Sequence, residues 1–547
     1  MLIIRRSIAA AGAVALALSL AARPSSQEFG TITFPNSGAP AAQEPFLTGV
    51  KALHNFQFDE AAEAFRRAQQ ADPSFAMAYW GEAMSHNHPL WAQQDVAAAT
   101  KVLERLDPTP AGRVDKARLP KEKAFFEALH VLYFSPGDKL ARDTAYAQAM
   151  ARMHAEWPGD HEIAIFYALS LLGTVRPGDV GFRRQALAAS IAQKVFRENP
   201  KHPGAAHFVI HAFDDPEHAP LGLEAAEAYA KIAPSAAHAL HMPSHIFVQL
   251  GMWKEAAASN VDAYKAAVDL NVRMKLPEGR EDFHTLSWLA YANTMLGRYD
   301  EARQNVAQAK AAADRNAGNR GIMNGYLGMR ARYMSDTGQW EKLTPGGAAP
   351  GGTEHANMPG MPGMGGGDAS ATWTYVVGVS AAKLGDLAAA EAAEAALKGL
   401  TAKAPGGPTS YAAKPHLIRE KQLGAVIRWA KGQKDDALAF AKEAAEVEKT
   451  MNAPSGPPEP IKPAFELYGE LLLEAGRAKE AMAAFDEALL RTPKRTPSLL
   501  GLARAAAAAG DTATARARFQ EIASMPGALP SSPAVQEAER ALKGASF

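Results

Sequence analysis

Histidine is the residue type whose spacing in this chain could do chemistry. His207 and His211 form one i, i+4 pair, and His241 and His245 form a second pair 34 residues further along. His238 precedes the second pair, so that three histidines share one face of a helix. Neutral imidazole binds zinc, copper, iron and nickel, and pairs on neighbouring helices ~8–10 Å apart could converge on one ion. We therefore predict a metal site at these five histidines; histidines that cap helix ends, fill the wall of a groove or hydrogen-bond to one another are the alternative.

The segment after the first pair holds further candidates for the same chemistry. Asp214, Asp215 and His218 could complete a metal site or supply a general base; a turn with a helix cap is the alternative interpretation. Pro243 lies between the two members of the second pair, where it removes a helical hydrogen bond. The helix is therefore expected to kink there or to restart at Pro243.

A glycine- and proline-rich segment, residues 344–369, interrupts the chain. It carries Met358, Met361 and Met364 at every third position. Thioethers suit Cu(I), so these side chains could bind copper; a low-complexity linker is the alternative. We expect an exposed loop, because the segment has no apolar face that could pack. It separates residues 45–343 from residues 370–547.

Composition excludes several other classes of function. Lys and Arg together number 58, as do Asp and Glu, so no basic field favours nucleic acid as a partner. The chain has no cysteine, which excludes disulfides, thiol catalysis and zinc–thiolate sites. We find no phosphate-binding loop, nucleophile elbow or metalloprotease motif.

The N-terminus is typical of a secretory signal. Arg5 and Arg6 precede an apolar run, residues 7–20, which small residues follow. We predict a signal peptide over residues 1–21, a polar lead-in over residues 22–44, and a periplasmic or secreted protein; an uncleaved anchor is the alternative. No later stretch is apolar enough to span a membrane, so no stable membrane insertion is expected after cleavage.

The elements that must position the histidines are helices. Alanine is abundant and no stretch alternates cleanly, so the chain is expected to be all-α. A turn that joins glycine, an aromatic residue and alanine recurs at residues 251–256 and 297–302, and Gly476 and Gly510 lie 34 residues apart. These features resemble the tetratricopeptide repeat, a helix–turn–helix unit of this length. The resemblance implies a right-handed α-solenoid in two blocks, residues 45–343 and 370–547. It is weak over residues 107–199.

The same resemblance implies which side chains line the concave groove. The groove-facing slots lie at set distances before the turn glycine, and His238, His241 and His245 occupy three of them before Gly251. His284 occupies the corresponding slot of the next unit and is a further candidate ligand. Short runs, among them residues 71–77, also resemble the tetratricopeptide repeat protein 38 family. That resemblance implies no reaction and supplies no catalytic residue.

We therefore predict an exported repeat protein whose groove binds a transition metal, zinc or copper, through its histidines. A scaffold without metal, which holds a protein or peptide partner in the groove, is a second interpretation. A metal-dependent hydrolase is a third, and a carboxylate beside an open coordination position would favour it. Acid should release a bound metal near the ordinary imidazole pKa of ~6.5, because protons compete for the same nitrogens.

Overall fold

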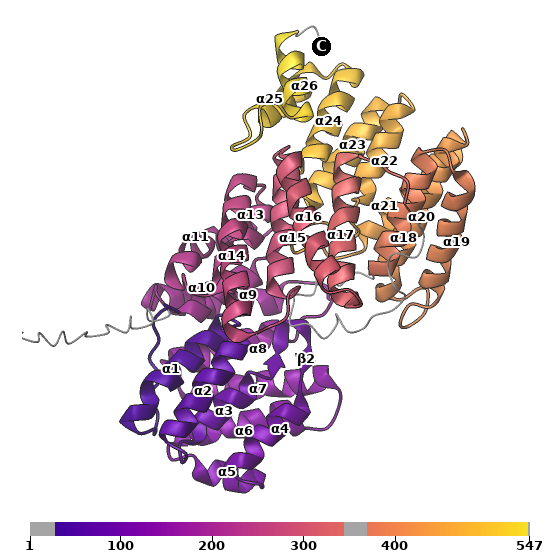
Figure 1. Ribbon diagram of the computed structural model, residues 1–547. Helices are drawn as coiled ribbons and strands as arrows, with labels where there is room; N and C mark the ends of the chain where they lie inside the picture. Colours follow the sequence, from indigo (N-terminus) through magenta and orange to yellow (C-terminus); the bar gives the residue numbers. More distant parts are fainter. Residues whose placement is uncertain (1–27, 344–368, 545–547) are drawn as a thin grey trace, which may run out of the picture.

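The computed structural model describes residues 28–343 and 369–544. Consecutive antiparallel helices pack on their neighbours along the whole described chain, and they build the right-handed α-solenoid that the sequence predicts (Figure 1). In the described part, strands are limited to the short hairpin of β1 (Asn87–His88) and β2 (Gln93–Gln94). No described helix is both long and apolar enough to cross a membrane. The predicted signal peptide and the methionines of residues 344–368 lie outside the described residues.

The helices follow one another with short connections. The first block begins with α1 (Pro40–His54), α2 (Phe58–Ala71), α3 (Ala76–Met84), η1 (Pro89–Trp91), α4 (Val96–Leu106), α5 (Pro110–Lys116), α6 (Pro120–Phe134), α7 (Lys139–Glu156), α8 (His161–Leu172) and α9 (Arg183–Glu198). It continues through α10 (Pro203–Ala212), η2 (Ala219–Gly222), α11 (Leu223–Ile232), α12 (Ala237–His241), α13 (Pro243–Gln249), α14 (Trp253–Met274), α15 (Glu281–Met295), α16 (Tyr299–Arg315) and α17 (Arg320–Thr337). The second block contains α18 (Ala369–Lys383), α19 (Leu387–Ala402), η4 (Tyr411–Ala413), α20 (Lys414–Ala430), α21 (Lys434–Lys449), α22 (Ala464–Glu474), α23 (Ala478–Arg491), α24 (Thr496–Ala509), α25 (Thr512–Ala523) and α26 (Pro533–Lys543).

The repeat units pack an aromatic ring between two glycines. In the first unit the ring of Phe65 fills the space beside Gly49 and Gly81, and a methyl group at Gly81 would overlap that ring. A unit near the C-terminus repeats the arrangement with the same residue spacing, around Phe485, Gly469 and Gly501. Glycine is needed here because only a residue without a side chain lets two helices approach this closely over a ring.

The chain enters the solenoid earlier than the sequence indicates. The first block was expected to begin at residue 45, but α1 begins at Pro40, which lies in the first turn of the helix, where a missing N–H costs nothing. The segment before it is not only polar. Phe29 and Phe34 are 1% and 3% exposed and belong to the same core as α1. These residues therefore form part of the folded first block.

Pro243 restarts a helix, as predicted. Helix α12 ends at His241 and α13 begins at Pro243, with Met242 between them in helical conformation. Because the backbone of Met242 stays near the α region, the two short helices continue in similar directions. His241 and His245 therefore remain on one side despite the missing hydrogen bond.

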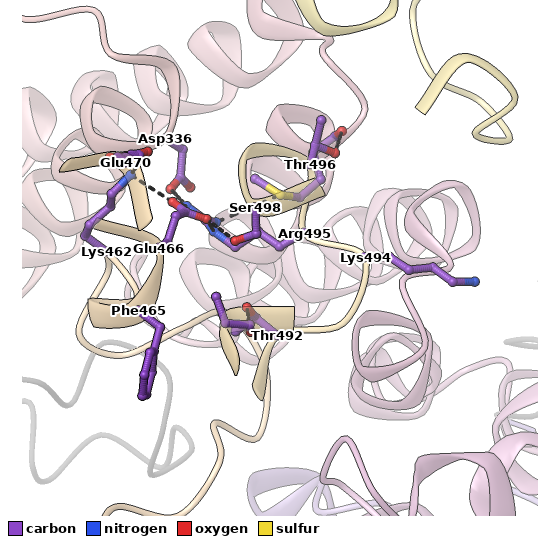
Figure 2. Close-up of polar contacts among 12 residues, drawn as sticks. Asp336, Lys462, Phe465, Glu466, Glu470, Thr492, Lys494, Arg495, Thr496 and Ser498 are labelled. Atoms are coloured by element: carbon purple, nitrogen blue, oxygen red, sulfur yellow. Dashed lines mark hydrogen bonds and ion pairs between the residues drawn. The ribbon is translucent and has the colours of Figure 1, made fainter. Parts of the chain in front are cut away.

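A buried ion network joins the two blocks (Figure 2). Arg495, just before α24, donates to Glu466 of α22 (Nε–Oε2 2.8 Å) and to Asp336 of α17 (Nη2–Oδ1 2.5 Å), and Lys462 donates to Glu466 at 2.8 Å. Burial alone would raise the pKa of Glu466, but Arg495 and Lys462 lower it to about 2. The network fixes the second block against α17 and so places the loop before α22, residues 453–463, beside the histidines.

Candidate metal centre

Six histidines from α10, α12, α13 and α15 gather in the first block. They form a first histidine group of His207, His211 and His238, and a second histidine group of His241, His245 and His284. Within each group, one nitrogen from every ring lies within 4.8 Å of the others. Such a spacing is what one metal ion with three imidazole ligands requires.

The two predicted pairs come together, but not around a single point. His211 and His245 have ring centroids 6.1 Å apart, so the pairs are neighbours. Each pair nevertheless takes its third member from another helix. His238, at the start of α12, faces the first pair, whereas His241, at the end of α12, faces His284 of α15. The four-histidine arrangement around one ion that the spacing suggested is therefore replaced by two groups of three.

Hydrogen bonds fix the tautomers of two rings in the second group. His241 donates from Nδ1 to Oδ1 of Asn260 at 2.7 Å, and the side-chain amide N–H of Asn260 donates to the carbonyl oxygen of Ala256. His245 donates from Nδ1 to the carboxylate of Asp214 at 2.6 Å. In a neutral imidazole with Nδ1 protonated, Nε2 carries the lone pair. Both Nε2 atoms are therefore acceptors, and they face each other at 3.1 Å.

The contact between Nε2 of His241 and Nε2 of His245 is unfavourable unless a cation lies between the two nitrogens. His284 can donate from Nε2 to His241 at 2.7 Å, but it leaves the lone pair of His245 facing that of His241. Two nitrogens bound to one tetrahedral metal at ~2.0–2.1 Å are ~3.3 Å apart. The ligands of the second group thus already have nearly the spacing of a loaded site, with outer hydrogen bonds that hold the rings in place.

The first histidine group is built on the same plan. His207 donates from Nδ1 to the main-chain carbonyl of His54 at 2.6 Å, which leaves its Nε2 free to face Nε2 of His238 at 3.1 Å. Nε2 of His211 is buried and has no hydrogen-bond partner. An unsatisfied buried nitrogen beside two others points to a group that supplies the missing interaction.

Burial keeps the cluster uncharged. It lowers the pKa of His207 and of His284 to about 3, and it lowers the pKa of His211, His238 and His241 well below the usual range. Repulsion between neighbouring imidazoles acts in the same direction. The rings of these five histidines are therefore neutral and ready to bind a metal at pH 7, so protons should displace the metal from them at lower pH than the ordinary value of ~6.5 suggests.

Aromatic rings and a loop cover the cluster, so it does not line an open groove. Phe56 packs on His207 at 4.4 Å between centroids, and its φ of +53° is unusual for so large a residue. Trp288 packs on His245 at 4.3 Å. Gly456 of the loop 453–463 approaches Trp288 so closely that a Cβ there would lie 2.6 Å from the ring. His207 and His245 are consequently 0% and 2% exposed, whereas His211 and His284 remain partly exposed.

The remaining sequence candidates have other roles. Asp214 is not in either group but orients His245. Asp215 and His218 bond to each other at 2.9 Å, and the His218 ring lies flat on Phe182, with centroids 3.6 Å apart. Asp215 also accepts main-chain N–H bonds from the two residues at 217 and 218. This is a turn stabilised by its own side chain, so the ligand interpretation of Asp215 and His218 is not supported by their position.

In a third group, formed by His54, Glu162 and His202, the side chains hydrogen-bond to one another. Glu162 accepts from His54 at 2.7 Å and from His202 at 3.1 Å, and all three side chains are buried. Burial would raise the pKa of Glu162, but the two histidines lower it to about 2. Nδ1 of His202 accepts the N–H of Ala205 and so caps α10. The group therefore anchors α10 and the carbonyl of His54 that holds His207.

Comparisons with known proteins agree with the architecture. Residues 472–542 match the family model of the tetratricopeptide repeat, so this part of the chain contains tetratricopeptide repeats. A comparison with curated protein sequences finds no match.

Three solved structures illustrate the likeness. A tetratricopeptide repeat protein from Parabacteroides merdae is 16% identical, over 57% of this chain and 98% of that chain, with a TM-score of 0.28. Yeast Tom70 is 13% identical over 92% and 95%, with a TM-score of 0.28. A chain of the APC/C hetero-tetramer Cut9–Hcn1 is 11% identical over 94% and 79%, with a TM-score of 0.33.

The sequence alone did not indicate the groups that orient the ligands. Asn260 lies nineteen residues beyond His241 on α14, and the carbonyl of His54 belongs to the first helix. Neither residue is distinguished by type or spacing. The turn-glycine register did identify His284, which proves to be a full member of the second histidine group.

Proposed function

We propose that this protein is a tetratricopeptide-repeat solenoid that binds transition metal ions, zinc or copper, through its two histidine groups. The observation that carries the proposal is the pair of Nε2 lone pairs of His241 and His245, which face each other at 3.1 Å. A proton could take the place between them only by creating a buried imidazolium, and burial lowers the pKa of His241 well below its usual range. A metal ion instead binds both lone pairs of the neutral rings at once and also that of the third histidine of the group.

Binding of metal is better supported than hydrolysis. Three imidazole ligands per ion leave a coordination position open, as in catalytic metal sites. However, among the described residues neither group contains a carboxylate, and Asp214 is already bound to Nδ1 of His245 at 2.6 Å. No carboxylate is therefore free there to act as a general base on a metal-bound water.

We further infer a second function, as a scaffold for protein partners, and an exported location. Tetratricopeptide repeats generally bind protein partners on the surfaces that their stacked helices create. The N-terminal arginine pair and apolar run support export to the periplasm or beyond. The buried histidine groups leave the exposed helical surface available to a partner.

Metal content and affinity test the first proposal. The full chain, purified without chelator, is analysed for metals, stripped, and titrated with zinc and with copper beside His241→Ala and His161→Ala. The His161 variant is the control, because this partly exposed residue of α8 pairs with Glu198 of α9, away from the six histidines. We expect metal in the wild type and the control, and weaker binding in His241→Ala. Binding no tighter than ~10 µM, about 7 kcal/mol, in every variant would overturn the proposal.

A further inference from the structure

We propose that the two histidine groups form one dinuclear copper centre that binds dioxygen between two copper ions. This inference rests on the proposed metal-binding function and adds to it the metal, its number and its ligand. It depends on three features of the cluster: the closeness of the two groups, their lack of negative charge, and the open position that each group leaves on its metal.

The two groups are close enough to act as one centre. The rings of His211 and His245 have centroids 6.1 Å apart, and those of His238 and His241 are 6.4 Å apart. His238 and His241 belong to the same five-residue helix, α12, which ties the groups together covalently. Since each ion lies ~2 Å from its ligands, ions in the two groups would be neighbours, as in the paired sites whose metals are ~3.5–4 Å apart.

The charge of the site favours Cu(I). All six ligands are imidazoles, which bring no negative charge to a metal, and the carboxylate nearest to them in the hydrogen-bond network is Asp214, bound to the outer nitrogen of His245. Two Cu(I) ions add two positive charges to this buried site, whereas two divalent ions add four. Because burying uncompensated charge costs free energy, this cost is smaller for two monovalent ions than for two divalent ions. Imidazole is a good copper ligand, and three of them leave one position open.

Dioxygen suits a pair of Cu(I) ions with open positions because it can accept one electron from each of them. Each Cu(I) transfers one electron to the bound molecule, so that two Cu(I) and one O₂ become two Cu(II) bridged by a peroxide, with no proton or further reductant required. In the reverse step the bound peroxide returns one electron to each Cu(II), and O₂ leaves the site. The apolar rings of Phe56 and Trp288 pack against the histidines, and the loop 453–463 lies against Trp288. His211 and His284 are the two ligands that are partly exposed.

Anaerobic loading followed by oxygenation tests the inference. The stripped full chain is titrated with a Cu(I) acetonitrile complex, its copper content is measured, and O₂ is then admitted. We expect two copper ions per chain, a peroxide-to-copper charge-transfer absorption that disappears under vacuum, and no electron paramagnetic resonance signal, because the two Cu(II) spins are coupled through the bridge.

Variants in each group separate a dinuclear centre from two independent sites. His211→Gln and His284→Gln each remove one ligand, and His161→Gln serves as the control; circular dichroism verifies that each variant is folded. Either ligand variant should lose the absorption and show the paramagnetic signal of isolated Cu(II) after oxidation. Wild-type protein that binds two copper ions but gives this isolated signal, or no absorption with O₂, overturns the dinuclear inference and leaves metal binding intact. Protein that binds no metal overturns both proposals.

Discussion

Acidification should destabilise the metal-free protein through its buried histidines. The pKa of His207 and of His284 is about 3 in the folded chain, against ~6.5 for an exposed imidazole. Between these values the unfolded chain binds more protons, so stability is complete above ~6.5 and falls as the pH is lowered toward 3. From pH 7.5 to pH 5 each of these histidines removes ~2 kcal/mol, or ~4 kcal/mol for the two. A typical domain has only ~5–15 kcal/mol in total.

Denaturant unfolding of the stripped protein at pH 7.5 and pH 5 measures this loss. In His284→Gln, whose amide does not titrate, the loss between the two pH values should shrink by ~2 kcal/mol. The comparison uses the pH difference within each variant, so that any change in packing cancels. His161→Gln controls for the removal of an imidazole remote from the cluster. A wild-type unfolding free energy that changes by less than ~1 kcal/mol would refute the argument that these rings are buried and neutral.

Three further substitutions test other parts of the structure. Asp214→Asn weakens the group that orients the second histidine group, so metal affinity measured by competition with a chelator should fall ~10–100-fold; unchanged affinity would contradict that role. Arg495→Met leaves Asp336 buried without its ion-pair partner and Glu466 with Lys462 alone, so the free energy of unfolding should drop by ~3–5 kcal/mol, and a neutral result would mean that the network is dispensable. Gly501→Ala places a methyl group against a buried ring and should cost ~1–3 kcal/mol in thermal or chemical denaturation. Gly399→Ala, where nothing lies within 4 Å, is the matched control and should be neutral or slightly stabilising.

The sequence is sufficient for the fold because the repeat is a local pattern. The recurring turn, the small residues at helix crossings and the 34-residue period all act within one unit or between adjacent units. Pro243 is similarly local, and the restart of the helix at that residue follows from the missing N–H. Residues 107–199, where the turn signature is absent, still form α5 to α9 because their apolar residues recur at helical spacing.

The histidine cluster shows where such local reasoning ends. Spacing by itself determined that His238, His241 and His245 share a helical face and that His284 occupies an equivalent slot, because these relations depend only on helix geometry and on the repeat period. Only the tertiary structure decided that the pairs divide into two groups of three, since that depends on which helices meet around α12.

The orientation of each ligand is likewise a property of the folded chain. The carbonyl of His54 lies 153 residues from His207 in sequence, and Pro454 lies 205 residues from Gln249, to which it is hydrogen-bonded beside the cluster. Partners of this kind leave no periodic signal, because a carbonyl is common to every residue and a loop has no repeating side-chain pattern. The sequence therefore determined the residues that could bind a metal. Long-range packing alone decided their tautomers, their burial and their grouping, because each of these depends on contacts between segments that are distant in the chain.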